Sequence, residues 1–178
     1  MVASQASAPL ALIWAQTTAG VIGGAGDIPW HIPGEQRRFK EFTIGGTVIM
    51  GRRTWDSLPA RVRPLPGREN IVVTRDAAFA APGARVVHTV DEALAAADPK
   101  RQAWCMGGGQ LYAQTIGRAT RLEVTEVALE VPGDAFAPPI GAEWRLASAD
   151  PGSGWHDGPA TPQHPEGLRY RFLSYVRR

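Results

Sequence analysis

The chain has 178 residues, of which 44% are hydrophobic and 20% charged, and its formal net charge is +2. This length and composition are typical of one compact soluble domain with its own core. We expect residues 10–178 to form that domain and residues 1–9 to be a flexible N-terminal extension. The near-neutral charge, without a long basic stripe, argues against a nucleic-acid-binding protein.

Membrane, disulfide-bonded and metal-binding classes are also disfavoured. The start of the chain lacks the basic and then apolar organisation of a signal peptide, and no apolar run is long enough to span a bilayer. Cys105 is the only cysteine and the four histidines are far apart, so we expect no disulfide framework and no metal site. We therefore expect a cytoplasmic protein without a membrane partner, with Cys105 in its core.

Short apolar runs alternate with short amphipathic ones along the chain. Strands are predicted at 10–16, 47–50, 70–74, 85–88, 102–106, 122–127 and 168–176, and helices at 34–42, 53–58, 90–97 and 110–116. The alternation of strand and helix predicts an α/β fold, with a mostly parallel sheet covered on both faces. Residues 150–167 are rich in Gly, Pro and Ser, which predicts a long surface loop before the last strand.

The first predicted helix carries an acidic residue, Glu35, directly after an apolar, proline-braced stretch. Pro33 at or near the first helical position and Glu35 at the positive end of the helix dipole favour a helix that begins here. Gln36, Phe39 and Phe42 share one stripe of that helix. The remaining side chains are expected to face water: Arg37, Arg38, Lys40 and Glu41. An acid against an apolar wall can bind and protonate a ring; the simpler alternative is a solvated first-turn acid.

A glycine triplet, residues 107–109, lies between a predicted buried strand and a predicted helix. Glycines at such a place let backbone N–H groups approach a phosphate, and the helix N-terminus adds partial positive charge. The triplet lacks the spaced G-x-G-x-x-G pattern, which disfavours a standard Rossmann site. Tight packing without a ligand is the alternative.

Arginines gather at the ends of two further predicted strands. The sequence Gly51-Arg52-Arg53-Thr54 follows the strand at 47–50, and Arg75 follows the strand at 70–74. Guanidinium groups beside a hydroxyl suit a terminal phosphate, because two parallel hydrogen bonds fix its orientation. The cluster therefore indicates an anionic partner, with a solvated basic rim as the alternative.

Together these segments resemble the dihydrofolate reductase family, and its actinobacterial members in particular. The resemblance covers residues 10–178 through LALIWAQ, GVIGGAGDIPWHIP, VIMGRRTWDSLP, LPGREN, VVTR, MGGGQLYA, EVTEV and LRYRFLSY. It implies one α/β domain with a central, mostly parallel sheet, a C-terminal antiparallel strand and four flanking helices. It also implies an oxidoreductase of one-carbon metabolism that acts as a monomer and binds dihydrofolate and antifolate inhibitors. The implied reaction is NADPH-dependent reduction of 7,8-dihydrofolate to tetrahydrofolate, with hydride transfer to C6 and protonation at N5.

The catalytic residues implied by the resemblance are Glu35, Trp30 and Thr125. Glu35 matches the carboxylate that binds the 2-amino group and N3 of the pterin, where bacterial members usually have aspartate. Thr125 matches the threonine that orients this carboxylate. Burial disfavours the charged form of Glu35, which should raise its pKa. Because the carboxylate binds the far side of the ring from N5, we expect a water molecule to deliver the proton.

The resemblance implies a substrate site in which a channel binds the benzoyl-glutamate tail of dihydrofolate and is lined by Phe39, Leu58, Val62 and Leu65. It also implies that Arg68 pairs with the α-carboxylate of this tail. A turn at Leu65-Pro66-Gly67 positions this arginine. Met106 replaces the isoleucine common in the family, and a flexible thioether can repack around inhibitors. The full implied set is Ile13, Trp14, Ala15, Ile28, Glu35, Gln36, Phe39, Leu58, Val62, Leu65, Arg68, Met106, Tyr112 and Thr125.

The implied cofactor site binds NADPH at three groups of residues. Ala15 and Ile22 match nicotinamide contacts, and Arg52, Thr74 and Arg75 match contacts to the 2′-phosphate and adenine. The pyrophosphate contacts match Arg53, Thr54 and residues 107–110, with a cis peptide between Gly107 and Gly108. The full implied set is Ala15, Ile22, Gly26, Asp27, Gly51, Arg52, Arg53, Thr54, Thr74, Arg75, Met106, Gly107, Gly108, Gly109, Gln110, Leu111 and Tyr112.

The stretch before Trp30 contains glycines at positions 20, 23, 24 and 26, where the family has a mobile loop over the nicotinamide. Glycines permit the required changes in φ and ψ, and a static surface loop is the alternative.

Two alternative functions remain open from the sequence. A reductase of a riboflavin precursor shares this general fold and NADPH, but would not be expected to carry W-x-x-P-x-E or Leu-Pro-Gly-Arg. The second alternative is a non-catalytic nucleotide-binding module. Loss of NADPH absorbance in the presence of dihydrofolate would separate these alternatives from a dihydrofolate reductase.

Overall fold

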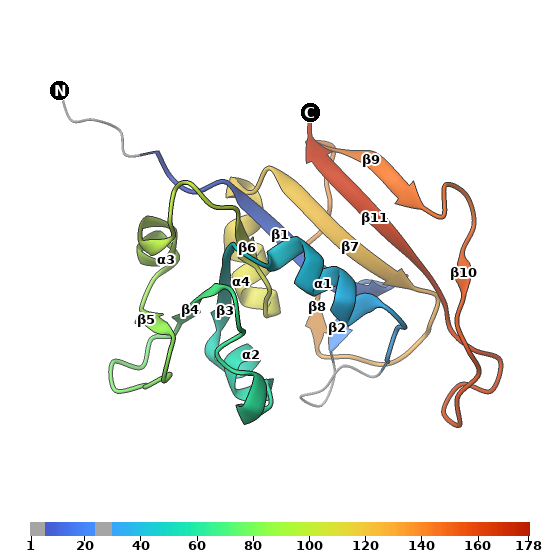
Figure 1. The fold of residues 1–178 in the computed structure, drawn as a ribbon. Helices are drawn as coiled ribbons and strands as arrows, with labels where there is room; N and C mark the ends of the chain where they lie inside the picture. The colour runs from blue at the N-terminus through green and yellow to red at the C-terminus, as the bar shows by residue number, and fades with distance from the viewer. Residues whose placement is uncertain (1–5, 24–29) are drawn as a thin grey trace.

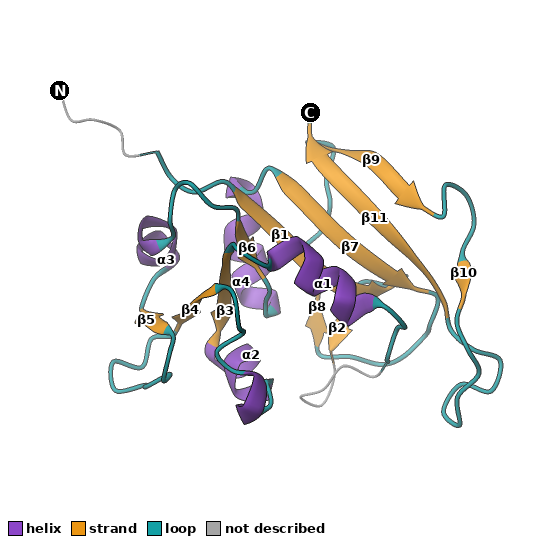
Figure 2. Ribbon diagram, viewed as in Figure 1, coloured by secondary structure: helices purple, strands orange, loops and turns teal. Residues whose placement is uncertain are grey.

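The computed structural model describes residues 6–23 and 30–178 of the chain. Figure 1 shows one central sheet with helices on its two faces, and Figure 2 shows the helices and strands by type. The elements are β1 (Leu10–Thr17), β2 (Val21–Gly23), α1 (Glu35–Thr43), β3 (Thr47–Gly51), α2 (Arg52–Ser57), η1 (Ala60–Val62), β4 (Glu69–Val73), β5 (Arg85–Val87), α3 (Val90–Ala96), β6 (Ala103–Cys105), α4 (Gly109–Thr115), η2 (Ile116–Arg118), β7 (Arg121–Val127), β8 (Ala135–Phe136), β9 (Trp144–Asp150), β10 (His156–Asp157) and β11 (Arg169–Arg177).

The main sheet has the strand order β10-β11-β7-β1-β6-β3-β4-β5, with β9 also paired to β11. The strands from β7 to β5 in this order run parallel. Strand β11 is antiparallel to β7, and β9 and β10 are antiparallel to β11. This architecture confirms the predicted α/β fold with a mostly parallel sheet and an antiparallel C-terminal strand.

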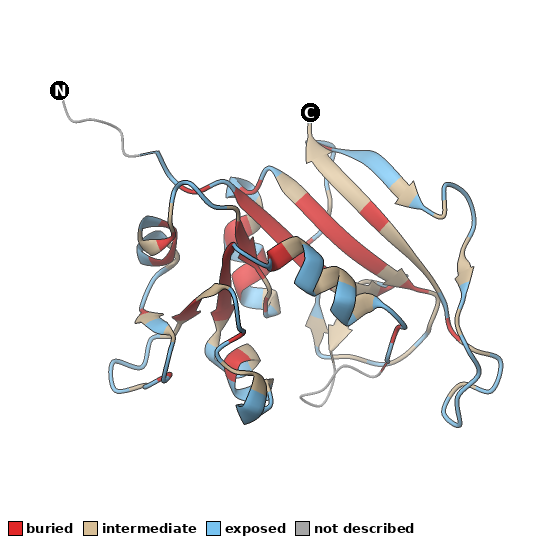
Figure 3. Ribbon diagram, viewed as in Figure 1, coloured by how far each residue is buried: buried red, intermediate tan, exposed pale blue. Residues whose placement is uncertain are grey.

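Strand β1 shows why the sheet has apolar layers on both sides. Successive side chains of a strand point to opposite faces. Leu10, Leu12 and Trp14 accordingly belong to one core cluster, with residues of α3 and α4, and Ala11 and Ile13 belong to another, with residues of α1 and α2. The buried residues therefore concentrate in the sheet, as Figure 3 shows.

The strands and helices predicted along the chain are all present, and no end is shifted by more than one residue. Four short or exposed strands were not predicted: β2, β8, β9 and β10. Strand β10 lies inside the stretch 150–167, so that stretch is not a loop throughout. Pro33 is not the first helical residue, because α1 begins at Glu35 and Gly34 caps it with a φ of 78°.

Contacts with the sheet already begin before β1. Ala8 is buried, and the carbonyl oxygen of Pro9 accepts hydrogen bonds from the backbone N–H of Ala103 and the side chain of Gln102. Cys105 is fully buried, as predicted. Within residues 6–23 and 30–178, no helix is both long enough and apolar enough to cross a membrane.

Candidate active site

Three loops that carry predicted cofactor residues leave the same edge of the sheet. Gly51 ends β3, Thr74 follows β4, and Met106 follows β6, and these three strands are parallel neighbours. In parallel α/β sheets, ligands bind in the crevice outside the carboxyl ends of the strands. The topology therefore brings together residues that lie more than fifty positions apart in the sequence.

The glycine triplet is tied to the end of β3. The backbone N–H of Gly51 donates to the carbonyl oxygen of Gly107 at 2.8 Å, and the peptide between Gly107 and Gly108 is cis, as the resemblance implied. Gly107 has a φ of 109°, and a Cβ there would lie 3.0 Å from the hydroxyl oxygen of Tyr112. A side chain at this position would be strained by the backbone and crowded by the ring.

The same loop is open where a phosphate would approach. A Cβ on Gly108 would meet no atom within 4 Å, whereas one on Gly109 would lie 3.2 Å from the carbonyl oxygen of Phe136 and 3.7 Å from the side chain of Ile22. The loop thus offers exposed backbone at Gly108, with Ile22 close to the start of α4. The side chains of Leu111 and Tyr112 are buried beneath it.

The arginines at the strand ends are mostly exposed. Arg52 pairs with Asp76 at 3.0 Å and with Asp56 at 3.6 Å, and its guanidinium lies 4.6 Å from the ring centre of Phe79. Exposed pairs of this kind contribute little to stability and exchange readily. Arg53 and Arg75 are exposed, and Thr54 and Thr74 are half-buried.

Arg63, another arginine in this part of the sequence, has a structural role. Its guanidinium donates to the carbonyl oxygens of Trp55, Asp56 and Leu58 at the end of α2. These contacts satisfy acceptors that a helix C-terminus leaves unpaired.

Glu35 is the first residue of α1 and points toward β7. Its carboxyl forms a hydrogen bond with the side chain of Thr125, and the charge of Arg38 also acts on its pKa. Burial raises the pKa of Glu35 to about 7, while the Thr125 hydrogen bond and the Arg38 charge oppose this rise. Removing a carboxylate from water disfavours its charged form more than these two contacts favour it. The expected rise in pKa is therefore confirmed, and Glu35 can exchange a proton near neutral pH.

An apolar wall flanks this acid. Trp30 and Ile32 pack in a cluster with Ala15 and Val127, and the Trp30 side-chain N–H is buried without an acceptor in the described part of the chain. On the other side of β1, the hydroxyl of Tyr112 donates to the carbonyl oxygen of Ile13 at 2.7 Å. A second aromatic ring, that of Trp14, lies 5.4 Å from the ring of Tyr112.

The predicted residues for the tail of the substrate form another cluster. Phe39, Leu58 and Leu65 pack in the same apolar group as Ile13 and as Met106, which the resemblance places at the pterin and nicotinamide pocket. Val62 in η1 is half-buried beside this segment, and Gln36 is exposed on α1.

Arg68 lies at the outer end of this cluster. It donates to Thr43 at 3.1 Å and to the carbonyl oxygen of Pro66 at 3.0 Å, and it follows Gly67, whose φ is 73°. Its guanidinium lies 5.9 Å from the ring centre of Phe39. Burial lowers the pKa of Arg68, and the residue remains a cation. A half-buried, fixed guanidinium at the end of an apolar channel is suited to a carboxylate.

Some predicted residues have no described position. Gly26, Asp27 and Ile28 lie outside the described residues, as do positions 24, 25 and 29. The proposed lid is therefore untested.

One prediction about the helix surface was wrong. Arg38 was expected to face water, but its guanidinium donates to the carboxylate of Glu123 at 2.8 Å, and only 19% of its side chain is exposed. Glu123 itself is fully buried, with no side-chain exposure. It also accepts from Arg121 at 2.7 Å and from Ser174 at 2.6 Å. One sequence signal could have indicated this role of Glu123. Side chains two positions apart on a strand share a face, so Glu123 lies on the same face of β7 as Thr125.

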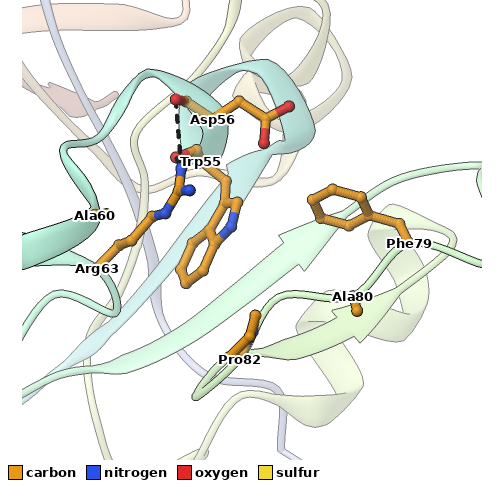
Figure 4. A pocket seen from close by; sticks show the side chains of 7 residues that line it. All are labelled: Trp55, Asp56, Ala60, Arg63, Phe79, Ala80 and Pro82. Atoms are coloured by element: carbon orange, nitrogen blue, oxygen red, sulfur yellow. Dashed lines mark hydrogen bonds between the residues drawn. The ribbon is translucent and has the colours of Figure 1, made fainter.

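A cavity of about 270 Å³ lies elsewhere, between α2 and the segment that precedes β5. Figure 4 shows Trp55 and Phe79 on opposite sides of it, with the Arg63 guanidinium beside Trp55. None of its lining residues is a predicted site residue: Trp55, Asp56, Ala60, Arg63, Phe79, Ala80 and Pro82.

Comparison with known proteins points to one family. The family model described as dihydrofolate reductase matches residues 9–164. The chain is 50% identical over 169 residues to the dihydrofolate reductase of Mycobacterium tuberculosis, covering 93% of this chain and 96% of that protein. It is 42% identical over 158 residues to that of Neisseria meningitidis serogroup B, covering 88% and 90%.

A solved structure agrees with these sequence matches. The structure of a dihydrofolate reductase from Enterococcus faecalis, complexed with NADP(H) and RAB-propyl, superposes with a TM-score of 0.79 at 32% identity and covers 96% of each chain. The family match spans both the glycine loop and the acidic helix described above. The chain therefore belongs to the dihydrofolate reductase family.

Proposed function

We propose that this chain reduces 7,8-dihydrofolate to 5,6,7,8-tetrahydrofolate at the expense of NADPH. One NADPH and one proton are consumed, and NADP⁺ is released. The observation that carries the proposal is Glu35, a half-buried carboxyl with a pKa of about 7, bonded to Thr125. A family relative in complex with NADP(H) supports the choice of cofactor.

The strand ends fit this cofactor. The cis Gly107–Gly108 loop exposes backbone next to Gly51, and Arg52 and Arg75 lie on the exposed ends of the neighbouring strands. The loop and the start of α4 would hold the pyrophosphate, and the arginines with Thr74 would hold the 2′-phosphate. When bound, NADPH supplies the hydride that is added to C6 of the pterin.

Glu35 would recognise the pterin through its 2-amino group and N3. A carboxylate accepts hydrogen bonds from two such donors side by side. Thr125 fixes the carboxyl from β7, while Trp30 and Ile32 exclude water on one side. A fixed acid in a dry site binds the ring in one orientation, which positions C6 for reduction.

The proton for N5 would come through water. Glu35 would bind the opposite edge of the ring and could not reach N5 itself. Because its pKa is about 7, it can share a proton with the bound pterin near neutral pH. The buried N–H of Trp30 is available to orient such a water. In this scheme Glu35 sets the proton affinity of the complex and is not the direct donor to N5.

The remainder of dihydrofolate would extend along α1. Phe39, Leu58 and Leu65 form an apolar channel for the benzoyl ring, and Arg68 ends it with a guanidinium for the α-carboxylate. Antifolate inhibitors that share the pterin-like ring would occupy the same place. Met106, at the inner end of the cluster, would adjust its flexible side chain to them.

We infer a monomer, because one chain supplies the acid, the glycine loop and the arginines. We also infer a cytoplasmic enzyme, because NADPH is supplied there. Light scattering of the purified protein with NADPH should give the mass of one chain; a stable dimer would contradict the first inference.

The decisive test is the loss of NADPH absorbance when dihydrofolate is added to the purified protein. Rapid loss with dihydrofolate is expected, with no loss when either substrate is left out. Binding of NADPH without turnover would favour a non-catalytic nucleotide-binding module. Turnover of a deaminated pyrimidine precursor of riboflavin, but not of dihydrofolate, would favour the second reductase.

A further inference from the structure

The acid of the site has a cation beside it on the same helix. Glu35 and Arg38 are three positions apart on α1, and side chains at this spacing are neighbours on a helix surface. An acid and an arginine so placed would ordinarily pair with each other. Here the Glu35 carboxyl bonds to Thr125, and the Arg38 guanidinium bonds to Glu123.

Glu123 is the residue that makes this arrangement stable. Its fully buried carboxylate accepts from Arg38 at 2.8 Å, from Arg121 at 2.7 Å and from Ser174 at 2.6 Å. A buried carboxylate needs such partners, because an unpaired charge away from water is strongly destabilising. Glu123 therefore holds Arg38 more strongly than a half-exposed carboxyl that already has a hydroxyl partner.

Two aromatic rings hold the Arg38 guanidinium in place. Its central carbon lies 4.7 Å from the ring centre of Phe42 and 4.4 Å from that of Phe172. Rings at these distances attract a guanidinium through their faces. Strand pairing sets the second contact, because Phe172 lies opposite Thr125, as Ser174 lies opposite Glu123.

We propose that Glu123 is a positioning residue that holds the Arg38 guanidinium away from Glu35, so that the Glu35 carboxyl stays on Thr125 and free for a ligand. That the ligand is the pterin ring rests on the proposed function. If Arg38 instead paired with Glu35, the carboxylate would be ionised and its acceptor sites would be occupied. By binding Arg38, the buried Glu123 carboxylate thus leaves the Glu35 carboxyl available to a ligand.

The charged groups around Glu35 predict pKa shifts of opposite sign for two variants, one without the Arg38 cation and one without the Glu123 charge. Arg38 faces it from α1, Glu123 and Arg121 lie on β7, and the Tyr112 hydroxyl lies on the α4 side. Removing the Arg38 cation should raise the pKa of Glu35. Glu123→Gln should lower it, because a negative charge is lost and Arg38 is released toward Glu35. A role in packing alone would give both variants the same defect, since each breaks the same ion pair.

The test is a titration of side-chain carboxyl carbons by NMR in protein labelled at glutamate, with the Glu35→Gln variant identifying the Glu35 signal. Compared with the parent protein, we expect the midpoint of Glu35 to rise by about 0.5 to 1 pH unit in Arg38→Met and to fall by about as much in Glu123→Gln. The high-pH fall of kcat/KM for dihydrofolate should move in the same directions. The control is Arg37→Met, which breaks the exposed Arg37–Glu41 pair on the same helix and should leave the midpoint unchanged.

Shifts in the same direction, or no shift in either variant, would overturn the proposal. If Glu123→Gln does not fold, the double variant Arg38→Met, Glu123→Gln removes both charges and leaves no Arg38 cation to move toward Glu35. A midpoint below that of the parent protein in the double variant would contradict the inference that released Arg38 lowers the pKa of Glu35. The titration needs no substrate. Failure of the proposed function would instead appear as an inactive parent protein with a normal titration.

Discussion

The two halves of the proposed site, one for the cofactor and one for the substrate, are built from different parts of the chain. In the proposed cofactor half, backbone at Gly51 and at residues 107–109 lies at the ends of parallel strands, and exposed arginines follow β3 and β4. In the substrate half, side chains meet between α1 and β7, and the acid there has its pKa raised by burial. The first half would recognise a charged group at the surface, and the second holds a titratable group partly away from water.

This difference predicts how each half responds to change. Contacts between exposed arginines and a phosphate are screened by salt and depend weakly on pH, because arginine does not titrate in the working range. Contacts at Glu35 should depend on pH and tolerate little change, because a half-buried acid has few alternative partners. Variants in the two halves should therefore be separable by salt and by pH.

The largest effect is expected for Glu35→Gln. The amide cannot titrate and presents an N–H group where the pterin also donates, so kcat near neutral pH should fall by about 100- to 1000-fold. NADPH binding, measured by fluorescence, should be retained because the cofactor half is intact. Unchanged turnover would sink the assignment of Glu35.

The same substitution should stabilise the protein at high pH. Folding raises the pKa of Glu35 from 4.5 to about 7, so the folded state binds this proton more tightly than the unfolded state. The contribution to stability is fully present below pH 4.5 and is lost as the pH rises through 7. Urea unfolding at pH 8 should show Glu35→Gln about 2 kcal/mol more stable than the parent, a discounted figure for a partly exposed group. The difference should vanish near pH 4.5; a constant difference at both pH values would contradict the buried titration.

In the cofactor half, replacing Arg52 and Arg75 together by alanine should reduce the preference for NADPH over NADH. Two exposed charge-assisted contacts of about 1 kcal/mol each correspond to about a 30-fold loss in the ratio of kcat/KM values. The loss should be smaller at high salt. The matched control replaces Arg85 and Arg145, two exposed arginines on β5 and β9, and should keep the preference. A retained preference in the site variant would show the assignment wrong.

The ability to predict these two halves from sequence also differed. The buried strands β1, β3, β4 and β6 are apolar runs bounded by turn residues, and glycine or arginine follows three of them, so strand-end chemistry could be read locally. Strands β2 and β8 span three and two residues, too few to show a period. Strand β9 is mostly exposed and lacks an apolar alternation.

The substrate half depends on contacts that no local pattern contains. Arg38 lies off the stripe that Phe39 and Phe42 share, which predicts a solvated side chain, yet its partner Glu123 lies 85 positions away. Helical spacing alone would pair Arg38 with Glu35. The packing of α1 against β7 pairs Arg38 with Glu123 and not with Glu35. This tertiary contact determines the chemistry of the site.

The smallest effect we expect lies where the two modes of recognition meet, at Arg68. Its guanidinium is half-buried and already bonded to Thr43. In the proposed site it would face a carboxylate of the substrate, as the exposed arginines would face a phosphate. Arg68→Leu should raise the KM for dihydrofolate about tenfold, as expected for one lost contact of about 1.4 kcal/mol to a charged group, with kcat little changed. Arg68→Lys should recover only part of this loss, because an ammonium cannot form the paired hydrogen bonds of a guanidinium. The nearby exposed Arg61→Leu is the control and should leave KM unaltered. An unaltered KM in Arg68→Leu would place the tail of the substrate elsewhere, because the apolar channel along α1 would then end without the cation that a carboxylate requires.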